Sequence, residues 1–239
     1  MRIAWLLVVV MLWGCSLLGV SNQEHPICRK LELVVPPEGH GPYAFICLDG
    51  QPWRPDSVLG TLDYILESGE RVHYLVLFFT LRDPTPALPF YEAVLSLSLY
   101  EKPLQTNTTY YLFNSNPYLR KLVANGTYTK EVLGEMGRFR ETEGDVFLAA
   151  YWIAREDSLR SWVRFDRIDT VQVEPFLLVF YEGAFEVVLS PFSRDPAWSR
   201  YPDAKLHFQG RFRVPAVTWD YLHRCWRERN CLRVGLRTL

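Results

Sequence analysis

The feature that most constrains the fold is a strict alternation of apolar and polar side chains near the C-terminal end. Over residues 205–214, one face would carry Leu206, Phe208, Phe212 and Val214, and the other Lys205, His207, Gln209, Arg211 and Arg213. A period of two places successive side chains on opposite faces of a β-strand. Gly210 interrupts the apolar face, which indicates a bulge or the close approach of another segment.

Further segments have strand character, at residues 31–35, 43–48, 72–81, 93–100, 145–154, 162–169, 176–181 and 185–189. Asp49-Gly50 is a strong hairpin-turn signal, and the polar stretch 155–160 predicts a second hairpin. Short helices are expected over 118–123 and 217–227. The sequence therefore predicts an all-β fold, an antiparallel β-sandwich with one or two short helices. A lipocalin- or calycin-like barrel is the alternative.

The N-terminus combines the charge of Arg2 with an apolar run over residues 3–13 and a cysteine directly after Gly14. The run is about half of the roughly 20 residues that a membrane-spanning helix needs, and it has the length of a signal-peptide core. We interpret Cys15 as the lipidated first residue of a mature bacterial lipoprotein. Because Trp13 is bulky for such a motif, an ordinary secretory signal cleaved beyond Cys15 is the main alternative, and a buried structural segment is a third.

This interpretation predicts a signal peptide over residues 1–15, a short tether over 16–27 and a single β domain over 28–239. The protein would sit in the bacterial cell envelope, on the outer membrane or the periplasmic face, held by a fatty chain such as palmitate on Cys15. Secretion without an anchor is the alternative localisation.

The cysteine count agrees with an oxidising compartment. If Cys15 carries lipid, four cysteines remain to pair, namely Cys28, Cys47, Cys225 and Cys231. Three connectivities are open. We favour Cys28 with Cys47 and Cys225 with Cys231, because each pair is close in sequence. The spacing does not fit a zinc site, and no metal or other cofactor is expected.

Charge excludes one class of partner. The net charge is −1 and no run of Lys or Arg occurs, so the electrostatic footprint of a nucleic-acid-binding protein is missing. The most basic surface is the polar face of the last strand, with Lys205, His207, Arg211 and Arg213. Such a face is usually only solvated. The alternative is a binding patch for an anionic glycan or for anionic headgroups.

The sequence offers little for catalysis. The five histidines are scattered, and no Ser or Cys lies in a Gly-x-Ser-x-Gly context. Asp166 and Asp169 are three residues apart and would face opposite sides of a strand, and Arg164 and Arg167 favour surface ion pairs with them. We therefore expect a protein that is not an enzyme. A hydrolase whose site is assembled in space is the alternative, and it would need histidines and carboxylates to meet in a cleft.

Residues 45–55, Phe-Ile-Cys-Leu-Asp-Gly-Gln-Pro-Trp-Arg-Pro, resemble the opening of a group of bacterial lipoproteins of unknown role that are common in Bacteroidota. In that group a strand ends in an Asn/Asp-Gly turn followed by a Gly-Lys/Gln-Pro-Trp step. The resemblance extends through segments 162–169, 181–187 and 206–214 and fails over 107–140. It implies a secreted or surface-anchored β domain and carries over no catalytic residue.

Aromatic residues make up 15% of the chain. Most are expected in the core, although such residues also line carbohydrate-binding faces. Trp53, just after the predicted turn, is expected to plug the end of the sandwich or barrel, or alternatively to line a ligand mouth. The predicted function is a lipid-anchored, non-catalytic module that binds a glycan, a small ligand or an envelope partner. Sequons at Asn107 and Asn125 keep open a eukaryotic or viral secreted glycoprotein.

Overall fold

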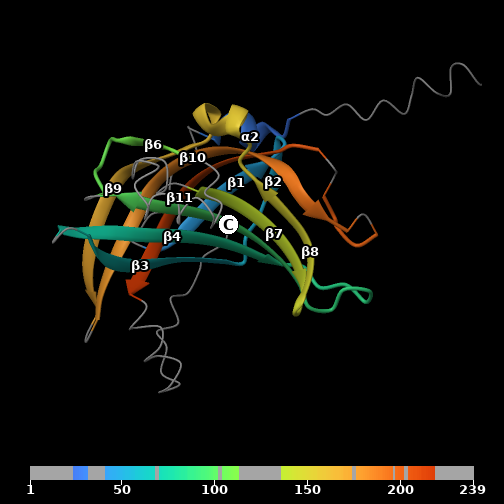
Figure 1. The fold of residues 1–239 in the computed structure, drawn as a ribbon, viewed down its shortest axis with the longest axis horizontal. Coiled ribbons are helices and arrows are strands. Elements are labelled where there is room, and N and C mark those ends of the chain that lie inside the picture. Colours follow the sequence, from blue (N-terminus) through green and yellow to red (C-terminus); the bar gives the residue numbers. More distant parts are fainter. Residues whose placement is uncertain are drawn as a thin grey trace, which may run out of the picture.

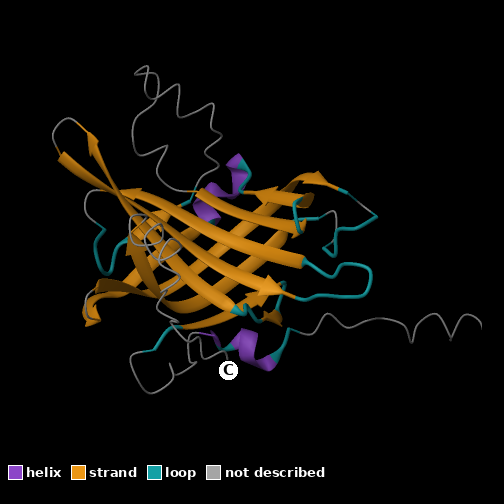
Figure 2. Cartoon of the chain, turned by 90° about the horizontal axis from the view of Figure 1, so that it is seen from below, coloured by secondary structure: helices purple, strands orange, loops and turns teal. Residues whose placement is uncertain are grey.

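The computed structural model describes residues 24–31, 41–67, 70–101, 104–112, 136–173, 176–195, 197–201 and 204–218. Nearly all of this backbone is extended (Figures 1 and 2). The strands are β1 (Tyr43–Leu48), β2 (Gln51–Trp53), β3 (Ser57–Glu67), β4 (Glu70–Arg82), β5 (Tyr91–Glu101), β6 (Thr109–Tyr111), β7 (Met136–Glu143), β8 (Val146–Trp152), β9 (Trp162–Val173), β10 (Phe176–Arg194) and β11 (Leu206–Thr218). The described helical elements are α2 (Pro26–Arg29) and the 3₁₀ helix η4 (Arg155–Arg160).

All eleven strands belong to one strongly curved sheet (Figure 2). The last strand, β11, pairs along one edge with β10 and along the other with β1 and then β3. Since β10 continues past β9 to pair with β8, the ladder through β3, β4, β5, β7, β8, β10 and β11 returns to its start. The prediction of an all-β fold is confirmed, and the sheet is sandwich- or barrel-like. Its pairs are antiparallel except β11 with β3.

The enclosed face of the sheet forms the core. The apolar residues that alternate along β11 are all fully buried there, namely Leu206, Phe208, Phe212 and Val214. Gly210 interrupts them because a Cβ at this position would lie 2.5 Å from Cε1 of Phe185, which confirms the expected close approach. Burying a phenylalanine contributes about 1.5–3 kcal/mol, so this face dominates the stability of the domain.

Several predicted boundaries are confirmed. The segment 43–48 is β1, and Asp49 and Gly50 form a two-residue turn with φ of 49° and 75° that pairs Leu48 with Gln51. Segments 72–81 and 93–100 lie within β4 and β5. The two strands expected at 176–181 and 185–189 are one strand, β10, which pairs continuously with β11.

The hairpin predicted at 155–160 is wrong. This stretch is η4, and β8 and β9 do not pair with each other but lie one after the other along the same edge of β10. The buried carboxylate of Asp157 in η4 binds Lys205 beside β11 and so helps to fix the crossing. Val217 and Thr218 belong to β11 and not to a helix. The expected elements at 118–123 and 219–227, and all but the first residue of 31–35, lie outside the described residues.

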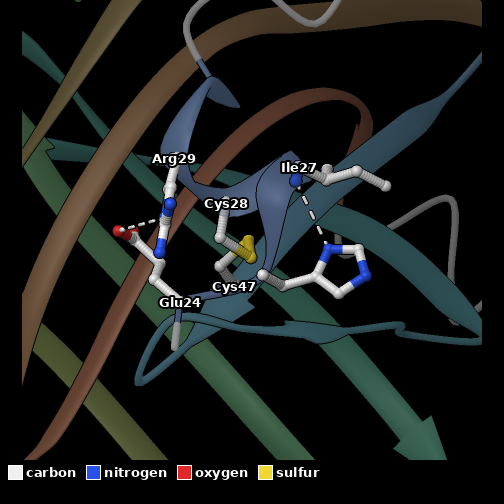
Figure 3. The surroundings of a disulfide bond; sticks show 6 residues. Glu24, Ile27, Cys28, Arg29 and Cys47 are labelled. Atoms are coloured by element: carbon white, nitrogen blue, oxygen red, sulfur yellow. Dashed lines mark hydrogen bonds and ion pairs between the residues drawn. A yellow bond between two sulfur atoms is a disulfide. The ribbon is translucent and has the colours of Figure 1, made fainter. Parts of the chain in front are cut away.

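The predicted disulfide between Cys28 and Cys47 is present (Figure 3). It fastens α2 to β1, and the backbone N–H of His25 donates to the carbonyl of Gly50 at 2.8 Å. The packed part of the chain therefore includes residues just before Cys28, which were expected to belong to the tether over 16–27. Cys15, Cys225 and Cys231 lie outside the described residues.

Candidate binding groove

A groove of about 570 Å³ lies on the outer face of β9, β10 and β11, beside the disulfide. Its polar lining consists of Arg29, Arg164, Asp166, Glu186, Gln209 and Arg211, and Trp162 adds an aromatic face. We call these seven residues the charged groove. Tyr111 of β6 pairs directly with Trp162 and is 43% exposed, so a second aromatic side chain stands next to the groove.

Cys28 and Arg29 of α2 form one wall of the groove, and the disulfide holds α2 in place. Arg29 and Ile27 lie on opposite sides of the disulfide (Figure 3). Arg29 lines the charged groove and lies 3.9 Å from Glu24, whereas Ile27 lines a separate apolar hollow of about 300 Å³. The disulfide therefore separates a polar depression from an apolar one.

A β-bulge in β9 organises the charges of the groove. Glu182 of β10 faces Arg167, but the next residue, Gly183, faces Phe165, so Asp166 is an extra residue in β9. Such a bulge shifts the alternation of side chains by one position. Gly183 is required here, because a Cβ would lie 1.9 Å from the carbonyl oxygen of Arg164.

The bulge brings Asp166 and Asp169 to the same outer face. Asp166 lies 4.0 Å from Nη2 of Arg211, and Asp169 lies 3.0 Å from Nη1 of Arg213. The expectation that the two carboxylates face opposite sides is therefore wrong. A spacing of three residues gives opposite faces only in a strand without a bulge.

The ion pairs predicted along β9 are confirmed. Nε of Arg164 lies 2.9 Å from Asp166, and Nε of Arg167 lies 2.7 Å from Asp169. Both arginines are about half exposed, so each pair contributes about 0–1 kcal/mol. The pair of Arg164 and Asp166 also fixes where a positive and a negative group face the groove.

The basic residues predicted for the last strand each lie beside a carboxylate, although Lys205 comes just before β11. His207 Nε2 is 2.8 Å from Oε1 of Glu186, Lys205 binds the carboxylates of η4, and Arg211 lines the groove. The hydrogen bond to Asp157 is the main cause that raises the pKa of Lys205. The outer face of β11 is therefore charged, but its positive groups lie next to negative groups of the same chain.

Arg213 is almost completely buried, with 3% of its side chain exposed. It lies 2.8 Å from Oε2 of Glu182 and 4.8 Å from the centre of the Phe180 ring. Desolvation works to raise the pKa of Asp169, but hydrogen bonds and charge from Arg167 and Arg213 outweigh it and hold that pKa below its usual value.

The two histidines whose side chains the structure describes do not lie together. His207 contacts Glu186 beside the groove, whereas Nδ1 of His25 accepts a hydrogen bond from the backbone of Ile27 in α2. His40 and His223 lie outside the described residues, and so does the side chain of His73. Among the residues that the structure places, no group of three or more His, Cys, Asp or Glu could hold a metal ion.

Trp53 is buried, as the plug interpretation predicts. It is 5% exposed, its Nε1 donates to the hydroxyl of Tyr201 at 3.1 Å, and its ring packs edge-on against Phe208. The sequence did not predict Trp162 or Gln209 as site residues. These two residues could be recognised as site residues only if the position of α2 next to their strands were already known.

Within the described ranges, no helix is long and apolar enough to cross a membrane. Comparisons with known proteins add no name or function to this geometry: no family model matches the chain, and neither a curated protein nor a solved structure matches it.

Proposed function

We propose that this chain is an extracytoplasmic lipoprotein, anchored through Cys15, that binds a glycan or another small polar ligand in the charged groove and catalyses no reaction. The observation that carries the binding part is the juxtaposition of Trp162 with Arg164, Glu186 and Gln209 in one open depression. Sugars present an apolar ring face and a rim of hydroxyl groups, which an aromatic ring and charged hydrogen-bonding groups can satisfy together.

Rigidity favours binding in this groove. One wall is fastened by the Cys28–Cys47 disulfide and the floor is a continuous sheet, so little conformational entropy would be lost when a ligand binds. The pairing of Arg164 with Asp166 also fixes a donor and an acceptor in advance.

The disulfide supports the proposed compartment as well, because such bonds persist in oxidising environments. A eukaryotic or viral secreted glycoprotein would use the same chemistry, and Asn107 in the first sequon is exposed. The source organism and the state of Cys15 separate the two possibilities.

The binding proposal is tested with the full chain in detergent on an array of neutral and uronate-containing oligosaccharides. We expect Trp162→Ala to weaken binding about three- to tenfold. Trp198→Ala is the matched control, because Trp198 is a solvent-accessible tryptophan that does not line the groove. Equal binding by both variants, or no binding by the wild-type chain, would refute the groove as a glycan site.

The anchoring proposal is tested separately by cell fractionation. We expect Cys15→Ala to move the protein from the membrane fraction to the soluble fraction, since stable anchoring depends on the acyl chains. An unchanged partition, or an intact mass without acyl groups, would disprove the anchor and leave the groove proposal untouched.

A further inference from the structure

A second set of outer-face residues lies on β7, β8 and β10, away from the charged groove. Arg138 of β7 pairs directly with Trp152 of β8, and Trp152 pairs directly with Ser190 of β10. Directly opposed residues share one face of a sheet. The neighbours Phe139 and Tyr151 are fully buried in the core, so these three side chains face outward.

These three side chains hold polar atoms that are buried without a partner. They are Nε of Arg138, Nε1 of Trp152 and Oγ of Ser190. A buried polar atom without a hydrogen bond costs about 1–3 kcal/mol, and each instance in a folded protein calls for an explanation. Two of the three atoms can only donate, so the missing partner must be an acceptor.

The charge of this cluster indicates an anion. Burial, and then the charge of Arg140, lower the pKa of Arg138, and no carboxylate of the described chain forms an ion pair with either arginine. On the outer face of β9 and β11, by contrast, arginines lie beside Asp or Glu. Two unpaired neighbouring guanidinium groups repel each other unless an anion binds between them.

An aromatic platform borders the cluster. Phe192 is the extra residue of a bulge in β10 and stacks on Trp152 with ring centres 4.1 Å apart and planes at 2°. Phe192 as a whole remains 64% exposed. The guanidinium carbon of Arg138 lies 5.9 Å from the centre of the Trp152 ring. The outer surface of Phe192 is therefore available to the organic part of a bound anion.

We propose that Arg138, Arg140, Trp152 and Ser190 form a binding site for a phosphate or sulfate monoester whose organic part lies on Phe192. The anion accepts hydrogen bonds from the guanidinium, the indole and the hydroxyl. This site uses other residues than the charged groove and does not depend on the proposed function. The same chemistry is found in a lipid headgroup and in a soluble sugar phosphate.

The experiment measures the thermal midpoint of the full chain in detergent against inorganic phosphate, glycerol 1-phosphate and glucose 1-phosphate, at constant ionic strength to exclude general screening. A specific ligand raises the midpoint with concentration. A stronger response to glycerol 1-phosphate identifies the headgroup source, and a stronger response to glucose 1-phosphate identifies the sugar source.

The variant Arg138→Met keeps the side-chain bulk and removes the charge. We expect it to weaken the apparent affinity about tenfold or more, because charged hydrogen bonds are lost. Arg167→Met is the matched control and should respond as the wild-type chain does, because Arg167 is also an outer-face arginine but belongs neither to this site nor to the charged groove. Ser190→Ala, expected to weaken binding about threefold, tests the site independently of how Arg138→Met folds.

Two results would overturn the proposal. One is the absence of any rise in the midpoint of the wild-type chain with all three oxyanions. The other is a response that Arg138→Met and Ser190→Ala leave unchanged, which would mean that the anions bind elsewhere.

Discussion

The two outer faces of this sheet treat arginine in opposite ways. On β9, β10 and β11, Arg164, Arg167 and Arg213 each lie within 3.0 Å of a carboxylate oxygen. On β7, Arg138 lies near the ring of Trp152, and neither Arg138 nor Arg140 forms an ion pair within the described chain. The arginines of the first face are therefore paired within the protein, whereas buried donors of the second face have no hydrogen-bond acceptor among the described residues.

The difference follows from the register of the strands. The bulge at Asp166 turns both carboxylates of β9 toward β11, where they meet cations that are distant in sequence. The bulge at Phe192 adds an aromatic ring and no charge beside Arg138. A bulge can therefore neutralise one face of a sheet and leave another face able to bind an anion.

The largest effect is expected from Gly183→Ala, which attacks the bulge itself. The new Cβ would lie 1.9 Å from a backbone oxygen that cannot move away, so we expect a loss of about 4 kcal/mol or a failure to fold. Urea denaturation provides the measurement. Gly41→Ala is the control, because a Cβ there meets no atom within 4 Å. Equal stability of the two variants would mean that the bulge does not form.

The second largest effect is expected for Arg213→Met, and it tests whether paired arginines on one outer face matter more for stability than unpaired arginines on the other. Arg213→Met leaves Asp169 and Glu182 without their shared cation, and we expect the free energy of unfolding to fall by about 3 kcal/mol. The measurement is again urea denaturation. A loss below about 1 kcal/mol would place this pair in the same class as exposed surface pairs.

A smaller, pH-dependent effect is expected at Asp169. Its pKa is lowered in the folded protein, so its ionisation stabilises the fold above the usual value of about 3.9. This stability is lost as the pH falls through the lower, folded pKa. The difference in unfolding free energy between the wild-type chain and Asp169→Asn should therefore shrink below about pH 4.

Denaturation curves at several pH values between neutral and strongly acidic conditions check this dependence. The matched control is Asp145→Asn, an exposed carboxylate in the turn between β7 and β8. A difference for Asp169→Asn that stays constant with pH would contradict the lowered pKa.

The smallest effect is expected at Arg138. Replacement by methionine removes a cation that has no ion-pair partner, so the stability in anion-free buffer should change by no more than about 0.5 kcal/mol or should rise. Thermal or urea denaturation checks this value. A loss as large as that of Arg213→Met would indicate that the two faces do not differ.

The strands that the sequence predicts well are those with clean alternation or an unambiguous turn. β1 with its Asp49-Gly50 turn has the predicted bounds, and nearly all of the predicted segment 205–214 lies in β11, although β11 continues to Thr218. β7 is missed because its inward face carries Gly137 and Glu141. Glu141 is fully buried and satisfied by the hydroxyl of Tyr91 at 2.9 Å. A buried carboxylate of this kind hides the period of two.

The site was only partly predictable. The sequence identified Arg211 and His207 as members of a charged outer face, and both lie in or beside the groove. It could not identify Trp162 or Arg29, because their proximity depends on the disulfide that brings α2 over β9 and β10. Nor could it distinguish the paired Arg213 from the unpaired Arg138.

By itself, then, the sequence determined the β character of the chain and the apolar face of its last strand, and it favoured the pairing of Cys28 with Cys47 among three connectivities. Only the tertiary structure decided which cations meet a carboxylate and which do not. The physical reason is that alternation and turn signals act between neighbours in sequence, whereas ion pairs across a sheet depend on the register of strands from distant segments. One bulge at Asp166 is enough to change that register.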